Sequence, residues 1–144
     1  MTDDQVAFAA KFKTRELHLA QLGNWDLAVR PGQLTLGAMV ISARSGETDF
    51  AALDPSENVD LVAAFALAEK LSKTAFGAVR INLLCLMMQD PIVHFHVLPR
   101  YDTEKDMFGE TWFDRDWPGP PKIGPSETSD TLLRHIRAAL RSAL

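Results

Sequence analysis

Alternation of apolar and polar positions predicts short strands in the first third of the chain. Residues 16–22 alternate with a period of two, which is typical of a strand that buries one face. Residues 25–29 and 34–41 are both apolar and are separated by residues 30–32, where a Pro-Gly pair favours a turn. We therefore expect one strand over 16–22, followed by a β-hairpin that turns at residues 30–32.

The residues around the next apolar stretch predict a long helix. Asp54 can cap its start, Pro55 suits the first helical position and Glu57 completes a capping box. Gly77 supplies the left-handed residue that ends many helices, so we expect the helix to end just before it. Residues 61–68 are apolar on nearly every side, so this helix should cross a sheet and contact another surface with its flank.

Two further strands and a final helix complete the predicted order. Residues 79–88 and 92–100 are strongly apolar and flank a turn at residues 90–91. A C-terminal helix capped by Asp130 should follow, because apolar residues recur there with helical spacing, at Leu132, Leu133, Ile136 and Leu140. The order strand, strand, strand, helix, strand, strand, helix predicts an antiparallel α+β domain.

Length and composition place the chain among single-domain globular proteins. Of its 144 residues, 47% are hydrophobic and 24% are charged, so the chain can form one core and we expect a single domain over residues 1–144. The 19 acidic and 15 basic residues give a net charge of -4, which provides no global basic field for a nucleic-acid polymer.

Cysteine content and the N-terminus bear on the cellular compartment. Cys85 is the only cysteine, so no disulfide forms within the chain and a reducing cytoplasm is expected. The first residues are acidic, and no basic stretch precedes an apolar one, which argues against a signal peptide. No apolar run approaches the roughly 18 residues that a membrane span requires, so we expect no membrane partner.

Two histidines are the candidate reactive residues of the chain. His94 and His96 lie two apart in a predicted strand, so both imidazoles point to one face while Phe95 and Val97 point to the other. Half of the four histidines therefore meet at one place. The structural interpretation is a half-exposed strand whose outer face carries histidine.

Three functional interpretations compete with that one. A metal site would need a third ligand, but His18 is distant in sequence and His135 lies on the predicted C-terminal helix. A cysteine nucleophile is disfavoured because Cys85 lies within an apolar run. The third interpretation makes a histidine itself the nucleophile, since a neutral imidazole attacks phosphorus well and also leaves well from the phosphorylated form.

The residues around the histidine pair carry a family resemblance. The strand contains the segment His94-Phe95-His96-Val97-Leu98-Pro99-Arg100-Tyr101. This segment resembles the signature of the histidine triad (HIT) superfamily, in which three histidines alternate with apolar residues and Pro-Arg often follows. Residues 80–88 and 34–41 resemble two further strands of that family, and residues 114–120 resemble a segment of bacterial diadenosine tetraphosphate hydrolase-like members.

The resemblance covers about residues 15–101 and implies a fold, an assembly and an activity. The implied fold is HIT-like α+β, with a five-stranded antiparallel sheet, one main packed helix and a C-terminal helical extension over residues 102–144. The implied assembly is a homodimer. The implied activity is cleavage of a dinucleoside polyphosphate or a phosphoramidate at the α-phosphorus of an adenine nucleotide, through a nucleotidyl-histidine intermediate and without a metal or other cofactor.

The resemblance also implies roles for single residues. His94 matches the nucleophile, and His96 matches the histidine that binds the phosphate. Asn82 matches an asparagine at the ribose-phosphate end of the site, and Gln89 stands where the family has a glutamine that contacts phosphate. Ile92 replaces the first histidine of the triad. The family's nucleophile is oriented by the main-chain carbonyl at that position, which Ile92 keeps.

A second departure concerns the leaving group. The family's Gly-Gln-Ser or Gly-Gln-Thr is replaced by Met88-Gln89-Asp90-Pro91, which removes a hydroxyl. Three functions therefore stay open. The first is a nucleotide hydrolase or transferase, and the second is a nucleotide-binding regulatory module with little or no turnover because the first triad histidine is Ile92. The third is a metal-binding His-x-His protein without a nucleotide.

Overall fold

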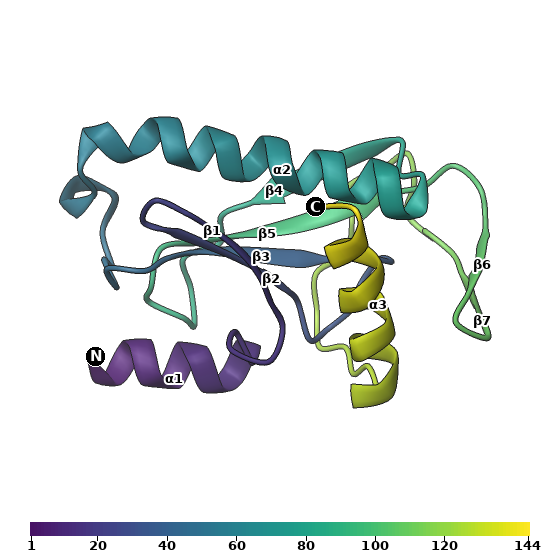
Figure 1. Cartoon of the computed structure of the whole chain (residues 1–144), viewed down its shortest axis with the longest axis horizontal. Coiled ribbons are helices and arrows are strands. Elements are labelled where there is room, and N and C mark those ends of the chain that lie inside the picture. Colours follow the sequence, from purple (N-terminus) through teal and green to yellow (C-terminus); the bar gives the residue numbers. More distant parts are fainter.

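A five-stranded antiparallel sheet in the order β1-β2-β3-β5-β4 forms the centre of the computed structural model, which describes all 144 residues. Its strands are β1 (His18–Leu22), β2 (Trp25–Val29), β3 (Met39–Ala43), β4 (Arg80–Leu84) and β5 (His94–Arg100). A separate hairpin consists of β6 (Lys105–Met107) and β7 (Glu110–Trp112). The α-helices are α1 (Asp3–Phe12), α2 (Asn58–Phe76) and α3 (Asp130–Ser142) (Figure 1). The predicted α+β class with a five-stranded antiparallel sheet is confirmed.

Helix α2 covers one face of the sheet. Its Phe65 contacts Phe95 of β5 edge to face, with ring centroids 5.2 Å apart, and Trp25 of β2 contacts the same ring at 6.1 Å. Such edge-to-face pairs stabilise a core beyond their buried area. Gly77 follows the helix with a φ of 70°, as predicted for its C-terminal end.

The start of α2 differs from the prediction. Asp54 does act as a cap, because its carboxylate accepts a hydrogen bond from the backbone N–H of Ser56 at 3.0 Å. The first turn, however, is a 3-10 turn over Pro55–Glu57, and the α-helix begins after it. The predicted capping box does not form, since the carboxylate of Glu57 accepts a hydrogen bond from Asn24 Nδ2 at 3.0 Å instead.

Helix α1, which the sequence analysis did not predict, lies on the other side of the sheet from α2 (Figure 1). Its start is a capping box: Thr2 accepts a hydrogen bond from the backbone N–H of Gln5, whose side chain accepts one from the backbone N–H of Thr2. Its buried Phe8 and Phe12 form a second, smaller core with Ala28, Val40 and Ile92. The face of the sheet that carries His94 and His96 is therefore covered by a helix.

The prediction of a tight turn between β2 and β3 is wrong. The two strands do pair, but residues 30–38 form a longer connection and β3 begins only at Met39. The side chain of Gln33 holds this loop together, with Nε2 donating to the carbonyls of Arg30 and Ala38 at 2.8 and 2.9 Å and Oε1 accepting from the N–H of Gly37 at 2.7 Å. One buried amide thus replaces the strand ladder that the apolar pattern suggested.

Two other predicted strands are shorter than expected. β4 ends at Leu84 rather than at residue 88, and β5 begins at His94 rather than at residue 92. Just before β5, the N–H of Val93 donates to the carbonyl of Glu47 at 2.9 Å, so that part of the chain pairs outside the regular ladder. Residues 85–91 are consequently free to form a loop that borders the candidate site.

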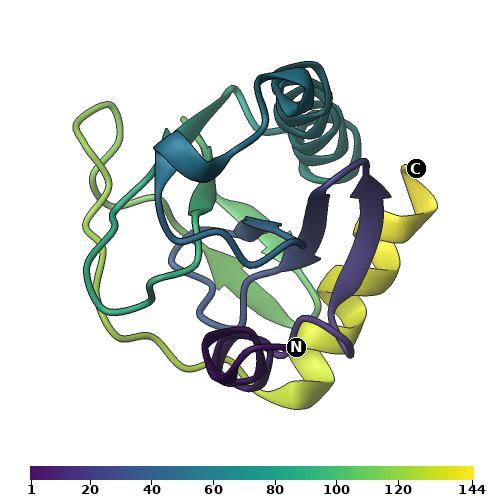
Figure 2. The ribbon, with the colours of Figure 1, turned by 90° about the vertical axis from the view of Figure 1, so that its left-hand side faces the viewer.

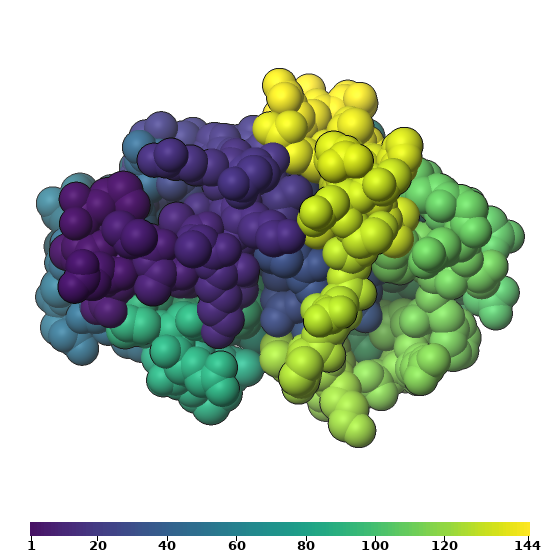
Figure 3. Space-filling model, turned by 90° about the horizontal axis from the view of Figure 1, so that it is seen from below, coloured from purple at the N-terminus to yellow at the C-terminus, as the bar shows by residue number.

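The C-terminal part of the chain returns to the sheet. Helix α3 occurs where it was predicted, but Ser129 is its cap, since its side chain accepts a hydrogen bond from the N–H of Leu132 at 3.2 Å. Leu133, Ile136 and Leu140 are buried in the same core as β2 and α2. Figures 2 and 3 show the first turns of α3 near α1, and the helix runs from there toward α2, which it contacts. None of the helices combines the length and apolar composition that crossing a membrane requires.

Candidate active site

His94 and His96 lie side by side on β5, with ring centroids 5.0 Å apart. Both side chains are buried, with residue exposures of 1% and 6%, so the interpretation of a half-exposed strand is wrong. Helix α1 provides the cover: Phe8 contacts His94 edge to face at 5.3 Å, and Phe12 lies 6.0 Å from His94 and 6.1 Å from His96. Phe95 points to the opposite face, as predicted.

The hydrogen bond of His94 determines which ring nitrogen is protonated. Its Nδ1 lies 2.6 Å from the main-chain carbonyl oxygen of Ile92. A carbonyl only accepts hydrogen bonds, so Nδ1 carries the proton and Nε2 of the neutral ring keeps a lone pair. The carbonyl at position 92 thus makes the contact that the family resemblance implied, while the Ile92 side chain is buried against α1.

His96 has the opposite arrangement. Its Nδ1 lies 3.2 Å from Nε of Arg30, which has no acceptor, so Nδ1 accepts and the proton of the neutral ring is on Nε2. Burial, together with the nearby charges of Arg30 and His94, lowers the pKa of His96 from 6.5 to about 4, against the opposing effect of Asp90. His96 is therefore neutral near pH 7. One ring presents a bare nitrogen and its neighbour presents an N–H.

A cavity of about 430 Å³, here called the histidine pocket, is bordered by both rings. Arg30, Lys11 and Asp90 supply its charged side chains, and Lys11 and Asp90 form an ion pair at 2.8 Å. The other residues that line it are Phe12, Leu86, Met88, Gln89, Ile123, Gly124 and Pro125. Four separate parts of the chain therefore border the histidines: α1, the connection after β2, the loop before β5 and the segment before α3.

The structure brings some of the predicted site residues together and not others. Gln89 is exposed and borders the histidine pocket with His94 and His96. Asn82 does not border it. Its Oδ1 accepts a hydrogen bond from Nη1 of Arg100 at 2.7 Å, and Arg100 is in turn paired with Asp114 at 2.8 Å. Both members of that ion pair are almost fully buried, with side chains 2% and 3% exposed.

Sequence reasoning missed several residues of the pocket. Arg30 carried no local signal, because its contact with His96 spans 66 positions in the chain. Lys11 and Phe12 belong to α1, whose only sequence signal was the capping pair Thr2 and Gln5. Figure 3 shows α1 and the chain that leads into α3 on one face of the molecule, an arrangement that no periodicity predicts.

The other candidate groups lie away from the two rings. Burial raises the pKa of the Cys85 thiol, which does not border the histidine pocket. His18 lies 3.1 Å from Asp26, and His135 stacks on Phe108 at 5.8 Å. No group of three or more His, Cys, Asp or Glu side chains is arranged to hold a metal ion.

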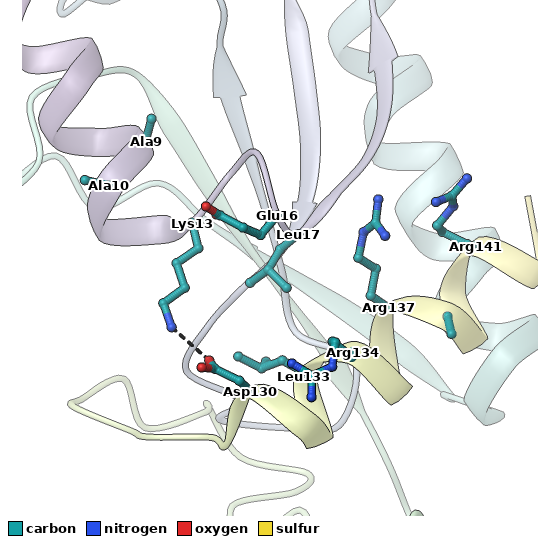
Figure 4. Close-up of a pocket in the computed structure, with 11 residues that line it drawn as sticks. Ala9, Ala10, Lys13, Glu16, Leu17, Asp130, Leu133, Arg134, Arg137 and Arg141 are labelled. Atoms are coloured by element: carbon teal, nitrogen blue, oxygen red, sulfur yellow. Dashed lines mark hydrogen bonds and ion pairs between the residues drawn. The ribbon is translucent and has the colours of Figure 1, made fainter.

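A larger cavity of about 930 Å³ lies between helices α1 and α3 and is here called the α1–α3 groove (Figure 4). Lys13 and Asp130 form an ion pair across it at 3.1 Å. Arg134, Arg137 and Arg141 line it from α3. The groove contains no histidine, cysteine, serine or threonine, so it offers none of the nucleophiles discussed above.

Comparison with known proteins supports a fold assignment. No protein-family model and no curated protein sequence matches the chain. Among solved structures, a histidine triad protein of Sinorhizobium meliloti is 20% identical with a TM-score of 0.69, covering 92% of this chain and 93% of that one. A hypothetical histidine triad nucleotide-binding protein of Sulfolobus tokodaii is 14% identical with a TM-score of 0.68, covering 94% and 90%.

A third similar structure is an enzyme. The diadenosine triphosphate hydrolase of Plasmodium falciparum is 12% identical with a TM-score of 0.62, covering 89% of this chain and 76% of that one. These likenesses extend over 89% to 94% of this chain. The chain thus has the fold of the histidine triad proteins.

Proposed function

We propose that this protein cleaves a nucleotide at its α-phosphorus, as a hydrolase or transferase, through a nucleotidyl intermediate on His94. The observation that carries the proposal is the pair of opposite tautomers. The main-chain carbonyl of Ile92 holds the proton of His94 on Nδ1, which leaves Nε2 as a nucleophile. His96 offers Nε2–H as a donor for a phosphate oxygen beside it.

The proposed reaction has two steps, the formation of a nucleotidyl-histidine and its hydrolysis. The Nε2 lone pair of His94 forms a bond to phosphorus, while the bond from phosphorus to the leaving group breaks and the leaving group departs with that electron pair. The His94 ring is then positively charged, and the carbonyl of Ile92 stabilises that charge through the Nδ1–H. Water next attacks phosphorus and gives up one proton to the solvent. The bond to His94 breaks, its electron pair returns to Nε2 so that the ring is neutral again, and the nucleoside monophosphate leaves.

The rim of the histidine pocket suits a phosphate chain. Gln89 is exposed there, and its amide can donate to phosphate oxygens in the role that the resemblance implied. The hydroxyl of the family is absent, but the ammonium group of Lys11 lies at the same rim, paired with Asp90. We assign Asn82 an indirect role, because its oxygen accepts a hydrogen bond from Arg100 and the residue does not border the pocket.

One observation favours a second function, a nucleotide-binding module with little turnover. The Ile92 side chain is only 2% exposed and packs against Phe8 and Phe12, so no polar side chain continues the hydrogen bond of its carbonyl. The positive charge that develops on His94 is then stabilised by the carbonyl of Ile92 alone, without a further hydrogen bond from a polar side chain at that position. Such a pocket binds a nucleotide but turns it over slowly or not at all.

A second copy of the chain is the partner that we propose. β4 is an edge strand of the sheet, and an edge strand offers unpaired backbone groups. Leu83 on β4 and Val59 and Val62 on α2 are large apolar side chains that remain exposed. Size-exclusion chromatography with light scattering tests this proposal. The wild type should elute with the mass of a dimer and Leu83→Asp with the mass of a monomer.

A product assay tests the proposed reaction. Diadenosine tetraphosphate and an adenosine phosphoramidate are incubated separately with the wild type and with His94→Ala, with and without a chelator. AMP that forms with the wild type despite the chelator, and not with the variant, supports the histidine nucleophile. Absence of AMP together with a nucleotide-dependent rise in melting temperature supports the binding module. Product formation that the chelator abolishes supports the metal interpretation.

A further inference from the structure

Arg30 is a cation that lies beside His96 without a carboxylate partner. It follows β2 and borders the histidine pocket. Its Nε donates to Nδ1 of His96 and its Nη1 donates to the carbonyl of Gly32 at 2.6 Å, but it takes part in none of the ion pairs of the chain. Burial lowers its pKa, because the site withholds part of the water that would stabilise the charge.

The third nitrogen of the guanidinium is free. Nη2 of Arg30 makes no hydrogen bond within the protein, whereas Nε and Nη1 both do. The other basic side chain of the pocket, Lys11, is neutralised by Asp90 at 2.8 Å. Arg30 is therefore the only unpaired cation that borders the pocket, and a ligand with negative oxygens would supply the acceptor that it lacks.

The backbone next to Arg30 is shaped around its guanidinium. A Cβ atom added at Gly32 would lie 2.6 Å from Nη1 of Arg30 and 3.0 Å from the carbonyl oxygen of Ser126. Such contacts are too short for carbon, so any side chain at Gly32 would push the guanidinium away from its present place. The Pro-Gly pair that suggested a tight turn instead makes room for Arg30.

We infer that Arg30 has two roles in the reaction proposed above: it positions His96 as an Nε2–H donor, and it binds a phosphate oxygen of the nucleotide through Nη2. The first role follows because a guanidinium only donates, so Nδ1 of His96 is held as an acceptor. The second follows because His96 is neutral, Lys11 is paired with Asp90, and the phosphate chain needs a cation. This inference rests on the proposed function, and its test separates the two.

The test uses Arg30→Met, which keeps the length of the side chain without its charge or donors. Imidazole nitrogen NMR of the free protein reports the tautomer of His96, and calorimetry measures the affinity for AMP. We expect His96 to lose its single Nε2–H form in the variant and AMP to bind about 10- to 100-fold more weakly. Arg30→Lys should recover part of the affinity, since it restores the charge but not the planar set of donors.

Two further variants keep the test decisive. Gly32→Ala should weaken AMP binding although Arg30 is still present, and it replaces Arg30→Met if that variant does not fold. Arg134→Met removes an arginine from the α1–α3 groove and is the matched control, expected to bind AMP as the wild type does. An unchanged His96 tautomer and unchanged AMP affinity in folded Arg30→Met would overturn the inference.

The outcomes also separate this inference from the proposed reaction. If the wild type forms no product but binds AMP, and Arg30→Met loses both the tautomer and the affinity, the role of Arg30 stands and the reaction falls. If the wild type forms AMP and Arg30→Met behaves identically, the reaction stands and the role of Arg30 falls. If the wild type binds no AMP, the phosphate-binding role falls and the NMR result alone decides the positioning role.

Discussion

The two cavities beside α1 differ in size and in the state of their polar groups. The α1–α3 groove is the larger, about 930 Å³ against about 430 Å³ for the histidine pocket. Its basic side chains lie on the surface, and its ion pair between Lys13 and Asp130 is 45% and 72% exposed. In the histidine pocket, His94 and His96 are buried and each has a hydrogen bond that places its proton.

This difference shows why volume is a poor guide to function here. A polar group that is taken out of water costs free energy unless it is hydrogen-bonded, so buried imidazoles with directed partners are features that folding alone does not favour. They are typical of functional sites, where a perturbed pKa and a fixed tautomer prepare a reaction. The groove has many charges, but most of them are exposed and are screened by water.

The largest predicted effect concerns the nucleophile. His94→Gln keeps a side chain of similar size but has no imidazole, so product formation should fall by about 1,000-fold or more. The initial rate of AMP release from diadenosine tetraphosphate measures it, with thermal melting to show that the variant is folded. A rate within tenfold of the wild type would refute the assignment of His94 as nucleophile.

The second largest effect should separate a buried ion pair, which borders neither cavity, from the exposed ion pair of the α1–α3 groove. Asp114→Ala leaves the buried guanidinium of Arg100 unpaired and should lower the free energy of unfolding by about 3–5 kcal/mol. Asp130→Ala breaks the exposed pair with Lys13 and should cost no more than about 1 kcal/mol. Urea unfolding of both variants gives the two values. Equal losses would show that burial does not distinguish the two ion pairs.

Acid should destabilise the protein through His96. Its pKa is about 4 in the folded protein against an ordinary value of 6.5, so between these pH values the unfolded chain binds a proton that the folded protein does not. The contribution of His96 to the free energy of unfolding is fully present above pH 6.5 and is lost as the pH falls toward 4. We expect a loss of up to about 2 kcal/mol, a modest value because the pocket admits some solvent. Melting curves of His96→Asn should depend less steeply on pH. Parallel curves for the two proteins would contradict this.

The smallest effect is expected in the α1–α3 groove. Arg134→Ala removes an exposed cation whose side chain contacts Thr131 of the same helix at 3.3 Å. Turnover should stay within about twofold of the wild type, and stability should change by no more than about 0.5 kcal/mol. A large loss of turnover would mean that the groove takes part in the reaction, and would remove the contrast between the two cavities.

Much of the sheet was accessible to sequence reasoning, because its signals are local. The period of two placed His94 and His96 on one face and Phe95 on the other, and Gly77 ended α2 as expected. The errors came where a side chain replaced backbone pairing. Gln33 holds residues 30–38 as a loop, and its amide bonds reach carbonyls that no periodic pattern identifies.

What the sequence determined by itself is the two-histidine motif, its strand and the departure at Ile92. Only the tertiary structure showed that α1 covers the pair, that Arg30 sets the proton of His96 and that residues 123–125 close the histidine pocket. The physical reason is the range of the interactions. Periodicity and capping act over a few residues, as does the hydrogen bond of His94 to the carbonyl of Ile92. The burial of both rings and the hydrogen bond of His96 to Arg30 instead join segments far apart in the chain.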